Sequence, residues 1–414
     1  MKFAIIRSIF LGGLSLLVLN CSSPMENDQK SAETTYDVAA YVWPSTHDDP
    51  VARKHLWSEG IGEWEIIQKG VPRFKGHYQP KIPLWGYEMG DDPAAMEKKI
   101  NAAADHGVNV FLFDWYWYDE GPFLESMVNS FVEAENSHRM KFYLMWANHD
   151  VPGNLWNHHR YKTDSLIWKG EVDWKNYKII VDRIINKYFK QPNYYMIDGK
   201  PVFSIFSMDD LVNSFGDLEG TAEAMDYLRD EVKKAGFPGV YLQTIGWSMN
   251  DEPILFRSGD DRGKGVNEVI DMLGLNSVTT YTWMIAGLNE DYVKWAEQGI
   301  ALRKKWDSLM DVPYFPCVSI GWDNTPRYPE LGMESVVHIG NTPESFAAYL
   351  QEAREYLKAR PEMPKLIILN AWNEYVEGSY LEPDMKWGYA YLEAVKEVMS
   401  GKYDRYKQTK TNTR

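Results

Sequence analysis

Short apolar runs alternate with longer amphipathic segments along most of the chain. The apolar runs are five to eight residues long and are flanked by polar or turn-forming residues, a pattern typical of buried strands. They predict eight strands, at 38–43, 108–115, 142–146, 202–206, 240–244, 275–279, 314–319 and 366–370.

The segments between these runs have the apolar spacing of helices. We expect helices at 92–106, 121–135, 174–188, 222–235, 290–309 and 343–359. Asp92 and Thr342 are each followed by proline, which predicts a capped helix start at both places. Gly107 and Gly236 predict the ends of two helices.

Continuous apolar strands that alternate with helices predict a parallel sheet covered on both faces. Eight such units favour the α/β class and a single (β/α)8 barrel of TIM type with loop insertions. An open dinucleotide-binding sheet is disfavoured, because no Gly-x-Gly-x-x-Gly sequence follows the first strand. An additional hairpin is expected at 194–201, with Asp198 and Gly199 in its turn.

The N-terminal segment has a different pattern. Lys2 and Arg7 flank the start of an apolar stretch at 9–19, which is too short to span a bilayer as a stable helix and is typical of an export signal. It ends at Cys21, and 1–21 resembles a bacterial lipoprotein signal in which Cys21 is lipidated. Asn20 replaces the small residue usual before that cysteine. Ordinary cleavage nearby is the alternative, and it also implies export.

The segment 22–35 is polar and lacks aromatic residues, which predicts a flexible tether. One catalytic domain is expected at 36–406, followed by a polar C-terminal end. We therefore expect a monomeric cell-envelope protein that is attached to a membrane through the lipid on Cys21. The other cysteine, Cys317, lies in an apolar run and is expected to be a buried packing residue.

Composition narrows the class of function. The chain has 44 Lys and Arg against 59 Asp and Glu, and its net charge of −15 disfavours nucleic acid as a partner. It also has 17 Trp, 26 Tyr and 16 Phe. Most of these belong in a core, but Trp and Tyr also offer flat apolar faces that suit sugar rings.

The segment after the last predicted strand carries the densest candidate chemistry. Reactive groups of a (β/α)8 barrel lie at the C-terminal ends of its strands. Glu374, Glu377 and Glu382 fall within nine positions there, and glycosidic hydrolysis needs two carboxyls of different pKa. Acidic residues also suit the first turn of a helix, but that does not explain the surrounding Trp, Asn and Tyr. We predict that Glu374 and Glu377 are catalytic.

Residues after the other strands are candidate contacts for a glycan substrate. Asp114 directly follows an apolar run, where a carboxylate would hold sugar hydroxyls or orient a catalytic group; a helix cap or a buried ion pair is equally compatible. The predicted substrate-binding residues are Trp43, Asp114, Trp115, Trp117, Trp146, Asn148, Gln243, Tyr281, Trp322, Asn373 and Tyr380. The same rim includes His149, Trp247, Trp283 and Asp323.

Signals for other chemistry are weak. His158 and His159 are adjacent and cannot both face one metal ion from a helix. The sequence contains no Gly-x-Ser-x-Gly elbow, no His-Glu-x-x-His zinc motif and no phosphate-binding loop. We therefore expect neither a metal nor another cofactor.

The segment after the last strand resembles the signature of the glycoside hydrolase family 99-like proteins, also called WbsX-like. The residues that carry the resemblance are Trp372-Asn373-Glu374-Tyr375-Val376-Glu377-Gly378 and Leu381-Glu382-Pro383-Asp384, supported by Asp114-Trp115-Tyr116-Trp117, Gly86-Tyr87 and Asp92-Pro93. The resemblance spans roughly residues 41–392. It implies a (β/α)8 barrel that acts on glycans.

Family 99 itself contains endo-α-mannosidases. The resemblance implies that Glu377 is the general acid on the leaving oxygen and later the base toward water. It further implies that Glu374 is the base toward the sugar's own 2-hydroxyl, giving a 1,2-anhydro intermediate and net retention. Tyr375 and Val376 replace a more aromatic, His-containing pair of the mannosidases, so the sugar identity stays open.

Two other functions remain open. Part of the family carries a glycosyltransferase label, but a nucleotide-sugar donor is normally cytosolic, which the export signal disfavours. A non-catalytic glycan-binding lipoprotein would not need both Glu374 and Glu377. We therefore predict an exported glycoside hydrolase that cleaves a poly- or oligosaccharide, with endo action on an α-mannoside as one option.

Overall fold

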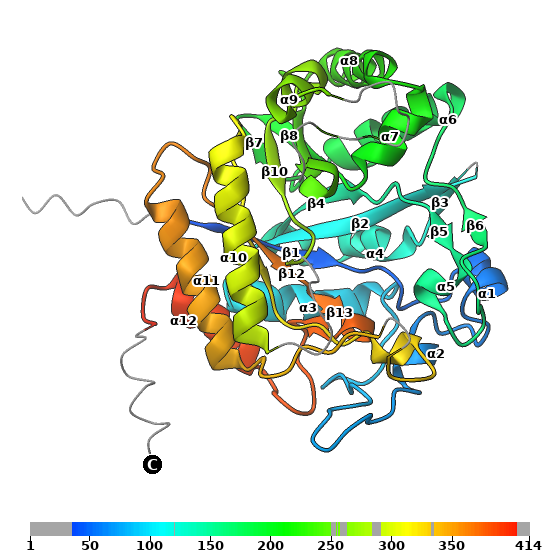
Figure 1. The fold of residues 1–414 in the computed structure, drawn as a ribbon, viewed down its shortest axis with the longest axis vertical. Coiled ribbons are helices and arrows are strands. Elements are labelled where there is room, and N and C mark those ends of the chain that lie inside the picture. The colour runs from blue at the N-terminus through cyan, green and yellow to red at the C-terminus, as the bar shows by residue number, and fades with distance from the viewer. Residues whose placement is uncertain are drawn as a thin grey trace, which may run out of the picture. The chain divides into compact units, whose positions relative to one another are not determined.

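The computed structural model describes residues 35–119, 121–249, 254, 256, 263–283, 291–332 and 335–403, and the folded unit begins at Tyr36 (Figure 1). The predicted export signal, the lipidation of Cys21 and the tether up to residue 34 lie outside these residues, as does the C-terminal end at 404–414.

Eight parallel strands of the described residues form one sheet, in the order β10-β9-β8-β4-β2-β1-β12-β11. A parallel bridge between Val278 of the edge strand β10 and Tyr314, just before the other edge strand, closes the barrel. The predicted (β/α)8 fold is therefore confirmed. The strands are β1 (Asp37–Val42), β2 (Val110–Tyr118), β4 (Lys141–Trp146), β8 (Lys200–Ile205), β9 (Tyr241–Ile245), β10 (Ser277–Thr279), β11 (Cys317–Ser319) and β12 (Leu366–Asn370).

Helices surround this sheet, and α10, α11 and α12 lie side by side (Figure 1). Amphipathic sequence explains them, since each long helix buries one apolar side against the strands. The helices are α1 (Pro50–His55), α2 (Trp64–Ile67), α3 (Pro93–Asp105), α4 (Ser126–Glu133), α5 (Gly153–Trp156), α6 (Trp174–Arg183), α7 (Met208–Phe215), α8 (Leu218–Lys234), α9 (Val266–Leu273), α10 (Tyr292–Leu309), α11 (Pro343–Lys358) and α12 (Ala390–Met399).

The four helix ends that were predicted from capping and glycine residues are confirmed. Asp92 accepts a hydrogen bond from the backbone N–H of Ala94, and Thr342 accepts one from Ser345. Gly107 and Gly236 have φ values of 90° and 99°, a region that favours glycine after a helix.

The segment 121–135 was predicted as one helix, and this is wrong at its start. β3 (Gly121–Phe123) instead pairs antiparallel with the end of β2, and α4 begins only at Ser126. The reason is that β2 continues to Tyr118, beyond the barrel edge, so its last backbone groups need a partner. The predicted hairpin at 194–201 is confirmed, because β7 (Met196–Ile197) pairs antiparallel with β8.

Candidate active site

A short hairpin after the last barrel strand carries both predicted catalytic glutamates. β13 (Asn373–Glu374) and β14 (Ser379–Tyr380) pair antiparallel, and the 3-10 turn Tyr375–Glu377 joins them. Asn373 fixes the hairpin to the end of β1, because its side chain donates to Trp43 O (2.8 Å) and accepts from Trp43 N (2.9 Å). Both glutamates are therefore held at the C-terminal mouth of the barrel.

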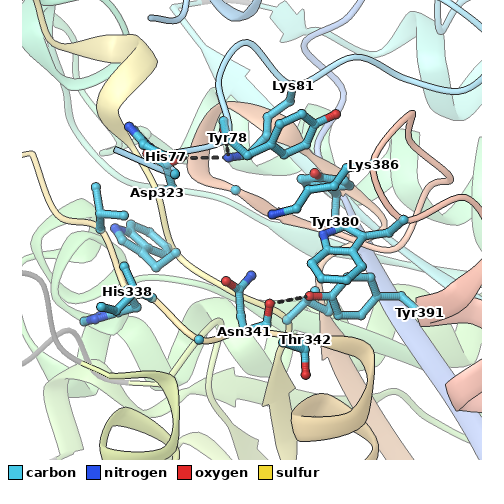
Figure 2. A pocket seen from close by; sticks show the side chains of 18 of the residues that line it. His77, Tyr78, Lys81, Asp323, His338, Asn341, Thr342, Tyr380, Lys386 and Tyr391 are labelled. Carbon is cyan, nitrogen blue, oxygen red and sulfur yellow. Dashed lines mark hydrogen bonds and ion pairs between the residues drawn. The ribbon is translucent and has the colours of Figure 1, made fainter. Parts of the chain in front are cut away.

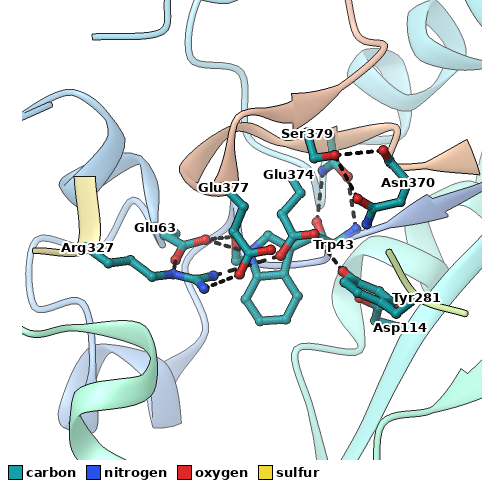
Figure 3. A network of polar contacts seen from close by, with 11 residues as sticks. Trp43, Glu63, Asp114, Tyr281, Arg327, Asn370, Glu374, Glu377 and Ser379 are labelled. Carbon is teal, nitrogen blue, oxygen red and sulfur yellow. Dashed lines mark hydrogen bonds and ion pairs between the residues drawn. The ribbon is translucent and has the colours of Figure 1, made fainter. Parts of the chain in front are cut away.

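Figure 3 shows Arg327 beside three glutamates. Arg327 lies in the 3-10 turn Thr325–Arg327, and its Nη1 donates to Glu377 Oε1. Its Nη2 lies 3.9 Å from Glu374 Oε1, and its Nε donates to Glu63 Oε1 at 3.4 Å. Burial lowers the pKa of Arg327, but the nearby carboxylates outweigh burial and raise it. Arg327 is thus a fixed cation that contacts Glu377 most closely.

Glu63 is the third glutamate in contact with Arg327. It is fully buried and accepts hydrogen bonds from Trp43 Nε1 and from Ser45 Oγ (2.9 Å). Burial raises its pKa, while Arg327 and these two donors oppose the rise. Glu63 therefore helps to position both Arg327 and the indole of Trp43.

The Tyr281 side chain contacts two carboxyl groups, those of Glu374 and Asp114. Its hydroxyl lies 2.6 Å from Glu374 Oε2 and 3.1 Å from Asp114 Oδ2 (Figure 3). A hydroxyl has one proton, so it can donate to only one of the two carboxyls at a time. The other contact becomes favourable when that carboxyl is itself protonated and donates to the hydroxyl.

The pKa values of Glu374 and Asp114 agree with a protonated carboxyl beside the Tyr281 hydroxyl. Burial and the charge of Glu377 raise the pKa of Glu374 well above its usual range, and Arg327 only partly opposes this. Burial is also the main cause of the raised pKa of Asp114. The cluster therefore holds carboxyls in unlike electrostatic surroundings within one pocket, which acid/base chemistry requires.

These groups line a cavity of about 440 Å³ with strongly aromatic walls. It contains six of the predicted site residues: Trp43, Asp114, Tyr281, Trp322, Glu374 and Glu377. Its walls also include Tyr116, Trp156, Phe206 and Trp247. Flat aromatic faces combined with a few polar groups are suited to sugar rings.

Three predicted tryptophans do not reach this cavity, because side chains alternate between the faces of a strand. Asp114 and Tyr116 on β2 face the cavity, so Trp115 and Trp117 point the other way. Trp115 Nε1 donates to Glu125, and its ring packs against Trp117.

The third tryptophan, Trp146, follows the same alternation on β4, where Met145 lines the cavity. The ring of Trp146 packs against Tyr177 of α6, with 6.2 Å between the ring centroids. The prediction that these tryptophans contact substrate is not supported by their positions.

Four predicted polar contacts are also engaged elsewhere. The amide of Asn373 is occupied by the Trp43 backbone, and that of Asn148 exchanges two hydrogen bonds with the Ser207 backbone. Gln243 is buried inside the barrel, where it accepts from Tyr143. Tyr380 lines a different cavity and donates to Asp384.

Other candidates have structural roles. The third acidic residue of the motif, Glu382, forms a buried ion pair with Lys99 of α3. Trp283 donates to the carbonyl of Cys317. Cys317 is buried as predicted, and burial raises the pKa of its thiol to about 12, which makes it a poor nucleophile.

Arg327 and Glu63 are the main residues that sequence reasoning missed. Arg327 follows Thr-Pro in a segment without a recognisable motif, and Glu63 lies twenty positions after Trp43. No local pattern marks either one, since both reach the site only through the tertiary fold.

Among the described residues, no group of three or more His, Cys, Asp or Glu is placed to hold a metal ion. In the same residues, no helix is long and apolar enough to cross a membrane.

The fold and site define a (β/α)8 barrel of the glycoside hydrolase family 99-like kind, with paired glutamates on the loop after its last strand. The model of the family described as "Glycosyltransferase WbsX" matches residues 38–395, and this chain belongs to that family. The resemblance noted in the sequence is thereby confirmed.

Relatives and solved structures agree with this placement. Two Xanthomonas campestris pv. campestris proteins, each named "Uncharacterized protein WxcX", are 23% identical over 383 residues. The match covers 88% of this chain and 49% of each relative, so the chain spans about half the length of these curated relatives.

Two solved structures share the fold. The family 99 endo-alpha-mannosidase from Bacteroides thetaiotaomicron has a TM-score of 0.54 at 12% identity, with 90% of this chain and 98% of that chain covered. A "Glycoside hydrolase-like protein" has a TM-score of 0.54 at 14% identity, with coverages of 89% and 95%. At this identity the likeness establishes the fold.

Proposed function

We propose that this chain is a glycoside hydrolase that cleaves a poly- or oligosaccharide, with Glu374 and Glu377 as its catalytic carboxyls. The observation that carries the proposal is that two carboxyls of one loop face one aromatic cavity in unlike surroundings. Burial and Glu377 raise the pKa of Glu374, whereas Arg327 forms an ion pair with Glu377. Hydrolysis needs such a pair, because one group gives a proton while its partner accepts one.

The roles follow the family 99-like scheme. Glu374 accepts the proton of the sugar 2-hydroxyl as that oxygen attacks C1, and Glu377 donates a proton to the leaving oxygen as its bond to C1 breaks. Water activated by Glu377 then opens the 1,2-anhydro sugar, and Glu374 returns its proton to the 2-oxygen.

The surroundings of Glu374 favour its protonated form, whereas the first step of this scheme needs Glu374 as a base. The raised pKa of Glu374 favours a proton on that residue, and Glu377 is paired with Arg327. We propose that an entering sugar separates Glu377 from Arg327, after which the proton of the pair moves to Glu377.

Leaving groups of different acidity test these roles. With a natural sugar leaving group, Glu377→Gln and Glu374→Gln should each lower kcat by roughly 10²–10⁴-fold. With an activated aryl leaving group, which departs without a proton, Glu377→Gln should recover most of its kcat/KM, which reports the first step, while its second step still lacks the base. Glu374→Gln should not recover. Recovery in Glu374→Gln alone would assign the acid to Glu374. Unchanged kcat in both variants on both substrates would refute the proposed function, with the exposed Glu393→Gln as a control.

A substrate panel would identify the sugar. α-Mannans come first, because one solved structure of this fold is described as an endo-alpha-mannosidase. Host N-glycans and pectic polysaccharides follow, each incubated with the purified protein in the absence of nucleotide sugars. Cleavage of one glycan that is lost in Glu377→Gln supports hydrolysis and names the substrate class.

The family description favours a glycosyltransferase as the second candidate. A transferase would release a nucleoside diphosphate only when a nucleotide sugar and an acceptor are both present. Transfer that depends on the nucleotide sugar, without cleavage of any glycan in the panel, would replace the hydrolase proposal.

A further inference from the structure

A second cavity adjoins the catalytic hairpin (Figure 2). Trp322 lines both cavities, and Gly378, which follows Glu377 directly, lines the second. Its volume is about 230 Å³, roughly half that of the catalytic cavity. This space suits one sugar ring better than a longer chain.

One group of charges in this cavity is internally neutralised. Asp323 Oδ2 accepts from Lys81 Nζ at 2.7 Å and contacts His77 Nε2 at 2.9 Å. Burial would raise the pKa of Asp323, but Lys81 and His77 lower it below its usual range. Lys81 and Asp323 therefore satisfy each other and leave little net charge for a ligand.

Lys386 is the cation left without a counter-ion. Among the described residues, no carboxylate lies within ion-pair distance of its ammonium, which instead lies 4.6 Å from the ring centre of Trp387 and 5.1 Å from that of Tyr78. Aromatic faces stabilise a cation without using up its N–H donors as ordinary hydrogen bonds do. The ammonium is therefore held in place with donors still available.

The nearest acid does not change this conclusion. Asp384 accepts from the Tyr380 hydroxyl at 2.8 Å and from the backbone N–H groups of Lys386 and Trp387. Its charge raises the pKa of Lys386, but burial and Lys81 outweigh it, so that pKa is lowered. Lys386 is exposed, and its ammonium, which has no carboxylate partner among the described residues, offers a charge-assisted contact to an anion.

A neutral donor faces the same space. Figure 2 shows the side-chain amide of Asn341 and the Lys386 ammonium directed into the cavity. The segment of Asn341 is fixed from α12, because the Tyr391 hydroxyl donates to its backbone carbonyl at 3.0 Å. Trp387 and Tyr391 supply aromatic walls next to these two polar groups.

We propose that this cavity binds a sugar residue that carries a carboxylate, with Lys386 and Asn341 on the carboxylate and the aromatic walls against the ring. A neutral sugar would desolvate the ammonium without pairing it, so the site selects acidic over neutral sugars. The proposal concerns binding and holds whether or not the catalytic cavity cleaves the same glycan.

Calorimetry with methyl glucuronoside and methyl glucoside tests the proposal on the folded protein. The glucuronoside should bind on the order of tenfold or more tightly than the glucoside, because one charge-assisted contact is gained. Lys386→Gln should abolish this preference, whereas Lys396→Gln, on the exposed side of α12, should keep it. Equal affinities for both sugars, or a preference that survives Lys386→Gln, would overturn the proposal.

Two further binding measurements show in which cavity the ligand lies and whether the sugar ring is recognised. Glu377→Gln should leave the affinity for the glucuronoside unchanged, and a loss would place the ligand in the catalytic cavity and overturn the proposal. Inorganic sulfate should bind more weakly than the glucuronoside, and equal binding would show an anion site without sugar recognition. Failure here leaves the hydrolase proposal intact, since that proposal is judged by kcat in the glutamate variants.

Discussion

At the residue scale, Glu374 combines burial with two neighbouring acids, Glu377 and Asp114. A carboxyl in these surroundings holds its proton more tightly in the folded chain than in the unfolded chain, where its pKa is about 4.3. Its contribution to stability is thus fully present below about pH 4.3 and is lost as pH rises toward the raised folded-state pKa.

Glu374→Gln should therefore gain thermal stability relative to the unaltered protein as pH rises from 4 to 8. Glutamine cannot release a proton, so the variant lacks the loss that the raised pKa imposes. Melting temperatures of both proteins across this range provide the measurement, with Glu393→Gln as the exposed control. A difference in melting temperature that stays constant with pH would contradict the raised pKa of Glu374.

At the element scale, α3 is attached to the catalytic loop by Lys99, which pairs with Glu382 at 2.5 Å with both side chains nearly unexposed. The neighbouring Lys98 pairs with Glu88 but is 43% exposed. The two lysines thus form a matched comparison of a buried and an exposed ion pair on one helix.

Lys99→Met should destabilise the fold by about 3–5 kcal/mol, because it leaves the Glu382 carboxylate buried without a cation. Lys98→Met should cost about 0–1 kcal/mol. Urea unfolding of the two variants measures the difference, and adding Glu382→Gln to Lys99→Met should recover part of the loss. Equal costs for the two lysines would show that the buried pair does not fix the loop.

The orientation of side chains on β2 could not be predicted from the sequence. The strand predicted at 108–115 continues through the aromatic residues to Tyr118, and the sequence did not show which of its side chains face the cavity. That choice follows from the position of Asp114 in the alternation, which places Tyr116 inside and Trp115 outside. A one-residue shift in strand register would reverse the two sets.

At the scale of the whole molecule, the barrel is closed unevenly. β2 and β4 pair over six residues, whereas in the described part of the chain β10 meets the segment before β11 through one bridge, between Val278 and Tyr314. Among the described residues, two backbone hydrogen bonds flank this bridge, from Val278 N to Pro313 O and from Phe315 N to Val278 O. This junction, which we call the seam, is the weakest contact between neighbouring strands of the barrel.

Amide hydrogen exchange should therefore be faster at Val278 and Phe315 than at Leu112 in the middle of β2. Local opening of a two-bond seam costs less free energy than opening of a strand paired on both sides. Mass spectrometry of peptides that cover these residues measures the exchange rates. Equal protection at the three amides would show that the barrel opens only as one unit.

The sequence by itself determined the eight barrel strands, the capped ends of a few long helices and the loop that carries Glu374 and Glu377. These features depend on apolar spacing, capping residues and a motif, all encoded within a few neighbouring positions. Glu63 and Arg327 are 264 positions apart, and only closure of the barrel brings them together beside Glu377. The tertiary structure alone decided which aromatic side chains line the cavity and which carboxyl lies against the arginine, because both depend on strand register and long-range packing.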